Sequence, residues 1–279
     1  MPFFRYEGSR LAYTVYGEGP RTFVLVHGLL MSQKMHRPLA RALAERGNRV
    51  VTLDLLGHGR SDRPRDMTRY SMPLFGQQMI ALLDHLEVEQ GVLGGTSLGA
   101  NATLEAAVHA PERVRGMVVE MPVLDNALLG CAIAFTPLMV ALSLGEPIMR
   151  LVARGARLIP TGAGPLLADV GLDTIRQEPG PSAAVLHGLF FGRTAPHKAL
   201  RRTLAAPTLV IGHQRDPIHP FSDSDALVAE LPNARLVQAS SILELRLRPE
   251  RLTGEIGDFL DTCWTARRRG GASRARRVA

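Results

Sequence analysis

Apolar runs and stretches of helical periodicity alternate along most of the chain. The runs are short and continuous, which is typical of strands buried on both faces of a parallel sheet. They lie at residues 22–26, 50–53, 91–96, 114–119 and 207–211, with further strands at 11–16 and 234–239. Helical spacing occupies residues 38–45, 72–86, 98–109 and two segments after residue 220. Because strand and helix alternate with short links, the pattern predicts an α/β fold with a doubly wound, mostly parallel sheet.

The alternation stops between residues 123 and 203. Apolar segments without strand signals are separated there by clusters of glycine and proline, which is typical of helices inserted into an α/β domain. The segments lie at residues 127–143, 147–158 and 182–191. We therefore predict a core formed by residues 1–122 and 204–264, with a helical cap, or lid, formed by residues 123–203.

One apolar segment of the insertion approaches the length of a membrane span. Residues 127–145 contain no charged side chain, and a helix needs about 20 apolar residues to cross a bilayer. Thr136-Pro137 is expected to interrupt the segment, which lies inside a globular pattern. We predict that it is buried in the lid and that the chain has no membrane span.

The net charge of +7 is concentrated at the C-terminus. Residues 267–279 carry six arginines and no acidic residue, so the rest of the chain is close to neutral. We expect residues 265–279 to form a disordered arginine-rich tail with non-specific affinity for polyanions. Because no aromatic residue lies between the arginines, we predict no specific nucleic-acid partner.

Composition and cysteine content indicate the class of protein and its compartment. The chain has 279 residues, 46% of them hydrophobic, which is enough to bury a sizeable core. Its two cysteines, Cys131 and Cys263, lie far apart and form no disulfide framework by pattern, which is typical of a reducing compartment. The N-terminal segment mixes charges with strand-like alternation and does not resemble a signal peptide. We predict a cytoplasmic location.

The stretch Gly95-Thr96-Ser97-Leu98-Gly99 joins a predicted strand to a predicted helix. A residue on so sharp a turn has a strained backbone and needs small neighbours, which explains the two glycines. The turn lifts the Ser97 hydroxyl clear of the sheet, and the unpaired N–H groups of the new helix face any anion that forms beside it. The Gly-x-Ser-x-Gly pattern also occurs in turns that have no catalytic role. Whether this turn is catalytic therefore depends on the other motifs in the sequence.

Three further loops follow predicted strands at the same edge of the sheet. They are His27-Gly28-Leu29-Leu30, the glycine-rich loop from Asp54 to Asp62, and the loop from Gly212 through Asp216-Pro217 to Pro220. Ligands of such sheets bind outside the carboxyl ends of the strands. Together with the Ser97 turn, these loops stand in the order found in the α/β-hydrolase superfamily, which residues 10–264 resemble.

The resemblance implies a serine hydrolase with a helical lid. By position it makes Ser97 the nucleophile and Asp216 the acid of a triad, with Asp125 as a second possible acid. The backbone N–H groups of Leu29 and Leu98 would form the oxyanion hole. The apolar side chains of the lid favour a small apolar substrate, an ester or a related C–C or amide bond.

The chain departs from the family pattern at the catalytic base. The family's histidine follows the last strand, but residues 239–249 contain none, and His219 is the last histidine of the chain. His219 is a candidate base, although Pro217 and Pro220 stiffen its loop, and Glu244 offers a carboxylate near the vacant position. The alternative is a non-hydrolytic ligand-binding protein, or a degenerate hydrolase without its base, on the same fold.

The remaining candidate contacts are less specific in sequence. His27 and Gly28 beside the oxyanion loop, and His187 and Phe190 in the lid, are candidate substrate contacts. Other histidines are predicted at the surface, namely His36, His85, His109 and His197. The histidines lack the spacing of a metal site and the glycines do not fit a dinucleotide motif, so we predict no metal and no cofactor. The sequence leaves the oligomeric state open.

Overall fold

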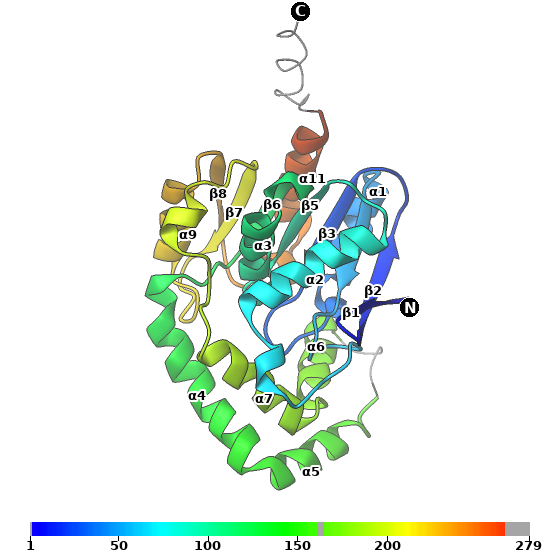
Figure 1. The fold of residues 1–279 in the computed structure, drawn as a ribbon, viewed down its shortest axis with the longest axis vertical. Coiled ribbons are helices and arrows are strands. Elements are labelled where there is room, and N and C mark those ends of the chain that lie inside the picture. The colour runs from blue at the N-terminus through cyan, green and yellow to red at the C-terminus, as the bar shows by residue number, and fades with distance from the viewer. Residues whose placement is uncertain (1, 161–164, 266–279) are drawn as a thin grey trace, which may run out of the picture.

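The computed structural model describes residues 2–160 and 165–265 and has an eight-stranded sheet at its centre (Figure 1). The strand order is β1-β2-β4-β3-β5-β6-β7-β8. β2 pairs antiparallel with β1 and β4, and every later pair is parallel, which confirms the predicted doubly wound, mostly parallel sheet. The strands are β1 Phe3–Tyr6, β2 Ser9–Tyr16, β3 Thr22–Val26, β4 Arg49–Leu53, β5 Gly91–Thr96, β6 Val114–Glu120, β7 Thr208–His213 and β8 Ala234–Ala239.

Side chains on the two faces of β3 enter two different hydrophobic cores. Phe23 and Leu25 join the cluster that contains α1 and α11, whereas Val24 and Val26 join the cluster that contains α2 and α3. Successive side chains of a strand point to opposite faces, so a strand that is apolar at every position needs helices on both sides. The core helices are α1 Arg37–Glu45, α2 Met72–His85, α3 Leu98–His109, α9 Phe221–Glu230, α10 Glu244–Leu247 and α11 Glu250–Thr265.

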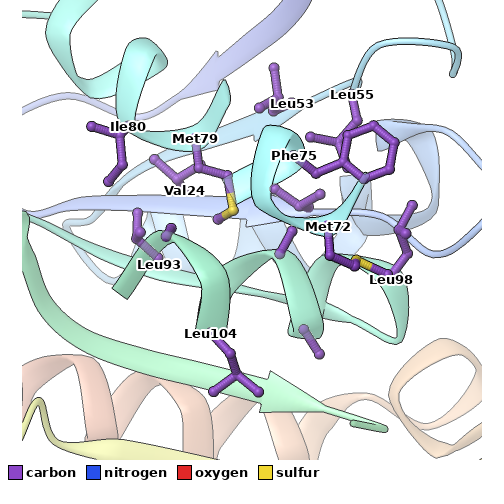
Figure 2. Close-up of a cluster of buried hydrophobic side chains, with 14 of the residues drawn as sticks. Val24, Leu53, Leu55, Met72, Phe75, Met79, Ile80, Leu93, Leu98 and Leu104 are labelled. Carbon is purple, nitrogen blue, oxygen red and sulfur yellow. The ribbon is translucent and has the colours of Figure 1, made fainter. Parts of the chain in front are cut away.

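The cluster that contains α2 and α3 includes Leu98, the residue that follows Ser97 (Figure 2). Phe75 and Met79 of α2 lie fully buried among strand residues such as Val24, Leu53 and Leu93. Full burial of a side chain of this size contributes about 1.5–3 kcal/mol to folding. The cluster therefore provides a rigid base for the loops at the carboxyl ends of the strands.

Helices α4 to α8 lie between β6 and β7 along the chain, and α4 to α7 project below the sheet in Figure 1. They fall within the residues predicted to form the insertion, although the division into core and lid stays a prediction. Their bounds are α4 Leu128–Leu144, α5 Glu146–Ala156, α6 Leu166–Ile175, α7 Pro179–Phe190 and α8 Lys198–Arg201. The short 3₁₀ helices η1 Gln33–His36, η2 Met67–Arg69, η3 Pro111–Arg113 and η4 Asp125–Ala127 complete the described elements.

Two expectations about the first inserted segment are wrong. Thr136-Pro137 does not interrupt it, because α4 runs on with Pro137 inside the helix and on its exposed side. The segment is also not buried. Asp125–Leu144 has a mean hydropathy of 2.1, and only 11% of its most apolar 18-residue stretch is buried. By length and composition it could cross a membrane. The absence of a membrane span and the cytoplasmic location stay predictions. The predicted arginine-rich tail lies outside the described residues from residue 266 onward.

Candidate active site

Ser97 stands on a strained turn between β5 and α3. Its φ angle of 54° is in the left-handed region, which non-glycine residues rarely adopt. A Cβ atom on Gly99 would lie 2.3 Å from the Val26 carbonyl oxygen, and one on Gly95 would lie 2.5 Å from the Gly99 carbonyl carbon. Only glycine fits at these two positions, because the turn packs directly on the end of β3.

The same packing brings the loop after β3 to the serine. The Gly99 N–H donates a hydrogen bond to the His27 carbonyl oxygen at 3.1 Å. Leu29, Ser97 and Leu98 line one cavity of about 370 Å³. Within residues 2–160 and 165–265, the N–H groups of Leu29 and Leu98 donate no hydrogen bond. Both residues line the same cavity as Ser97, which is compatible with the predicted oxyanion hole. The oxyanion hole itself stays a prediction.

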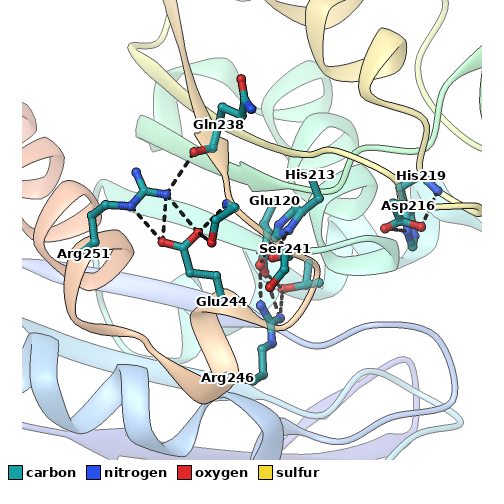
Figure 3. Close-up of polar contacts among 11 residues, drawn as sticks. Glu120, His213, Asp216, His219, Gln238, Ser241, Glu244, Arg246 and Arg251 are labelled. Atoms are coloured by element: carbon teal, nitrogen blue, oxygen red, sulfur yellow. Dashed lines mark hydrogen bonds and ion pairs between the residues drawn. The ribbon is translucent and has the colours of Figure 1, made fainter.

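His219 lies between Ser97 and Asp216. Its Nε2 is 2.8 Å from Ser97 Oγ, and its Nδ1 is 2.8 Å from Asp216 Oδ2. When Nδ1 donates its proton to the carboxylate, Nε2 is left as an acceptor for the serine hydroxyl. Figure 3 shows the histidine–aspartate contact on the loop that follows β7.

Asp216 also organises the loop that carries the histidine. Its Oδ1 accepts hydrogen bonds from the N–H groups of Ile218 and His219, at 2.9 and 3.0 Å. Burial raises the pKa of the Asp216 carboxyl, but the hydrogen bonds and charge of His219 outweigh burial, and the net pKa lies below its usual value. Asp216 is therefore held as a carboxylate facing the imidazole.

The cavity beside Ser97 is apolar. None of its lining residues, all from the described part of the chain, carries a charge. They are Leu29, Met72, Ser97, Leu98, Val123, Leu128, Cys131, Ala132, Phe135, Leu186, Leu189, Phe190, Gly192 and Thr194. Both the core and helices α4 and α7 contribute, so the inserted helices form one wall of the site.

Of the four candidate substrate contacts, only Phe190 lines this cavity. His27 is fully buried, with Nε2 accepting a hydrogen bond from the Leu55 N–H and Nδ1 2.8 Å from the Gly28 carbonyl oxygen. Gly28 is likewise buried behind the loop, and His187 has Nδ1 2.8 Å from the Ala183 carbonyl oxygen. Because His27, Gly28 and His187 do not line this cavity, their roles as substrate contacts stay predictions.

The loop after β8, where the family places its histidine, supports the core instead (Figure 3). The Ser241 carbonyl oxygen lies 2.8 Å from His213 Nδ1. Arg246 forms a buried ion pair with Glu120. It also donates a hydrogen bond at 2.9 Å to the hydroxyl of Thr96, the residue immediately before Ser97. Burial raises the pKa of Glu120, but Arg246 and His213 outweigh burial and hold its pKa far below the usual range.

The other two candidate carboxylates are Glu244 and Asp125. Glu244 pairs with Arg251 at 2.8 Å and accepts a hydrogen bond from the Ser240 hydroxyl. Asp125, the second possible acid, is exposed on η4. Asp223 instead accepts N–H bonds from Leu124 and Ala127 near that position, a structural role that the sequence pattern did not reveal.

Metal-binding geometry is not found in the described part of the chain. Within residues 2–160 and 165–265 there is no group of three His, Cys, Asp or Glu side chains that could hold a metal ion. Cys131 and Cys263 are free thiols, and burial raises the pKa of Cys131 to about 11. The absence of a metal and of a cofactor stays a prediction.

Comparison with known proteins identifies the family of this chain. The profile of a family described as "alpha/beta hydrolase fold" matches residues 21–135. A 2-hydroxymuconate semialdehyde hydrolase of Pseudomonas putida is 31% identical over 200 residues, which cover 67% of this chain and 67% of that protein. The chain belongs to the α/β-hydrolase family.

Other proteins match over a greater length. An uncharacterized protein of Mycobacterium tuberculosis is 25% identical over 282 residues, covering 94% of this chain and 81% of its own. The crystal structure of the enol-lactonase from Burkholderia xenovorans LB400 superposes with a TM-score of 0.74 at 20% identity, covering 93% of this chain and all of that one. The predicted α/β-hydrolase fold is confirmed, and the relatives support a hydrolase.

In this α/β hydrolase the candidate base named from sequence, His219, is the histidine that lies against Ser97. The signal for it was that no other histidine follows Asp216. The cavity residues Cys131 and Thr194 carried no sequence signal, because each lies in a segment without a motif.

Proposed function

We propose that this protein is a serine hydrolase in which Ser97 is the nucleophile, His219 the general base and Asp216 the acid. The observation that carries the proposal is the hydrogen-bond chain Ser97 Oγ to His219 Nε2 and His219 Nδ1 to Asp216 Oδ2, 2.8 Å at each step. A serine hydroxyl is a weak nucleophile until a positioned base takes its proton. The chain of contacts supplies that base and an anion to orient it.

The reaction proceeds in two halves. Ser97 Oγ attacks the carbonyl carbon while its proton moves to His219 Nε2, and the N–H groups of Leu29 and Leu98 stabilise the oxyanion. The imidazolium then protonates the leaving alcohol, and an acyl-serine remains. Water attacks this ester, gives its proton to His219, and the serine leaves with that proton. Asp216 stabilises the imidazolium in both halves and is not itself protonated.

The cavity favours a small apolar substrate. A volume of about 370 Å³ lies at the low end of the range for small-molecule sites. Since none of the lining residues carries a charge, a charged acyl group would lose its hydration without an ion-pair partner. We therefore propose a short, uncharged ester or lactone; a C–C or amide bond beside a carbonyl is a further option.

A fluorophosphonate probe and p-nitrophenyl butyrate test the nucleophile. The wild type is expected to be labelled and to hydrolyse the ester, whereas Ser97→Ala loses both. Ser143→Ala is the matched control, because Ser143 is exposed on α4 and its hydroxyl donates only to the Met139 carbonyl oxygen. Labelling that persists in Ser97→Ala would contradict the assignment of the nucleophile.

The same assay separates hydrolysis from ligand binding. If the wild type is neither labelled nor active, the alternative of a binding protein on this fold is favoured. If it is active, the ratio of kcat/KM for p-nitrophenyl butyrate over a p-nitrophenyl ester with a carboxylate on its acyl chain is expected to exceed about tenfold, because the cavity offers no cation.

A further inference from the structure

Helix α4 is apolar on two opposite sides. Its inner side lines the Ser97 cavity through Cys131, Ala132 and Phe135. Its outer side exposes Leu129 and Leu144, at 72% and 84% of their full accessible area. A helix that is hydrophobic all round is normally enclosed by protein or lipid. With 11% of its most apolar window buried and its first residue at Leu128, α4 is neither a core helix nor an N-terminal signal sequence.

Helix α5 extends this exposed apolar surface. We define the outer face by its six most exposed aliphatic residues, Leu129, Ile133, Leu144, Ile148, Leu151 and Leu158. The first three of these residues lie in α4 and the next two in α5, spaced by three, four or a sum of such steps, so each set lies along one side of its helix. Leu158 lies in the turn just after α5. Figure 1 shows α4 and α5 at the outer edge of the insertion, at the opposite end of the molecule from the end of α11.

The charges beside the outer face are basic. Arg65, Arg150, Arg154 and Arg157 line one cavity next to α5, with Glu178 as its single acid. The acid of α5, Glu146, is paired with Arg65 at 2.9 Å and with Arg150. Two copies of the chain meeting through this face would bring like charges together, whereas anionic headgroups would neutralise them.

We propose that the outer face docks the protein onto the surface of a bilayer that contains anionic lipid. The apolar residues of α4 and α5 enter the boundary between headgroups and acyl chains, and Arg150 and Arg154 face the lipid phosphates, as in helices that lie in the membrane plane. The inner side of α4 stays on the protein, where α4 packs against α7. The helix therefore lies on the membrane rather than across it.

This docking places the cavity next to the lipid. Phe190 lines the cavity and is half exposed, and its ring lies 5.7 Å from that of the exposed Phe191. An apolar ester dissolved in the bilayer would then reach Ser97 past the same helices that hold the membrane. This consequence rests on the proposed function, whereas the docking itself does not.

Co-sedimentation of the full chain with vesicles tests the proposal. Vesicles of phosphatidylcholine with phosphatidylglycerol are compared with vesicles of phosphatidylcholine alone, for the wild type and for Leu144→Ser/Ile148→Ser. The double variant is expected to bind at least about tenfold more weakly, because it removes two large apolar groups from the contact. Arg150→Gln/Arg154→Gln is expected to lose most of the preference for anionic vesicles, about tenfold or more.

Leu247→Ser is the matched control, because Leu247 is 61% exposed on α10, outside the outer face. Every variant keeps residues 266–279, so binding through the arginine-rich tail is the same in all. Unchanged urea unfolding of each variant verifies its fold. Ser97→Ala is expected to bind vesicles like the wild type, so a failed activity assay and a failed docking assay are distinguishable.

Two results would overturn the proposal. One is equal sedimentation of the wild type and Leu144→Ser/Ile148→Ser, including no sedimentation of either. The other is a wild type that light scattering shows to be dimeric, that ignores vesicles and that becomes monomeric in the double variant. That result would make the outer face an interface between copies of the chain.

Discussion

His219 and Asp216 contact each other within a single loop, three residues apart, with Nδ1 of the histidine 2.8 Å from Oδ2 of the aspartate. The other oxygen of Asp216 accepts the His219 N–H, so one carboxylate holds both the backbone and the ring of the histidine. The hydroxyl of Ser97 lies 2.8 Å from the far side of that ring. The loop after β8 has no histidine, and the imidazole that contacts Ser97 comes from the loop after β7 instead.

Replacement of His219 by glutamine is expected to lower kcat/KM for p-nitrophenyl butyrate by about 10³-fold or more, because the proton of Ser97 loses its acceptor. Residues that act as a unit are not additive, so Ser97→Ala/His219→Gln should be no slower than Ser97→Ala. His187→Gln serves as the control, since its ring bonds the Ala183 carbonyl oxygen outside the cavity. Wild-type activity in His219→Gln would place the base elsewhere.

Asp216→Asn is expected to reduce kcat/KM by about 10²–10⁴-fold, because an amide cannot stabilise the imidazolium as a carboxylate does. Asp125→Asn, which changes the exposed second candidate acid, should leave the rate unchanged. Steady-state kinetics on the same ester distinguish the two. The reverse order of effects would assign the acid to Asp125.

The buried pair of Glu120 and Arg246 predicts a large effect on stability. Arg246→Met leaves a buried carboxylate without its cation, which is expected to lower the free energy of unfolding by about 3–5 kcal/mol. Glu120→Gln/Arg246→Met removes both charges and should recover part of that loss. Urea unfolding measures both, with Arg235→Met as the control, because the exposed Arg235–Glu255 pair contributes about 1 kcal/mol or less. Equal losses for the two arginines would contradict the buried pairing.

His36 predicts loss of stability in acid. The prediction that it lies on the surface is wrong: it is 1% exposed, with Nε2 3.0 Å from the Val26 carbonyl oxygen. Burial, assisted by the charge of Arg246, lowers the pKa of His36 to about 3. The unfolded chain, with a pKa near 6.5, therefore binds the proton more tightly than the folded protein.

The free energy of unfolding should consequently fall as the pH drops from about 6.5 to about 3, by about 1.4 kcal/mol per pH unit from this group. His27 and His58 add to the effect, since burial also lowers the pKa of each. His36→Gln removes one titrating group and should flatten the pH dependence measured by urea unfolding, whereas the exposed His109→Gln should not. An unchanged slope in His36→Gln would show that His36 is protonated in the folded state.

Local chain properties were sufficient to predict the sheet and the serine turn. Continuous apolar runs such as Thr22–Val26 specify strands covered on both faces, and the glycines at 95 and 99 are needed by backbone contacts with neighbouring segments. These patterns depend on side-chain period and backbone sterics, which a sequence displays directly.

Sequence patterns were less informative for the groups whose role depends on a distant partner. The apolar residues of α4 have the composition of a buried segment, and only the packing of the insertion leaves Leu129 and Leu144 uncovered. Likewise, Glu244 and Arg246 are near neighbours in sequence but have different partners, Arg251 and Glu120. The charge and hydrophobicity of a residue indicate which kinds of contact it can make, but they do not indicate which residue it contacts.

By itself, then, the sequence determined the order of strands and helices, the serine turn and the loop that carries Asp216. The tertiary structure decided which imidazole reaches the serine and which apolar surface stays open. The physical reason is distance along the chain: Ser97 and His219 are 122 residues apart. Their contact depends on how β5 and β7 are spaced in the sheet and on how the Asp216 loop bends, and no local pattern encodes that spacing.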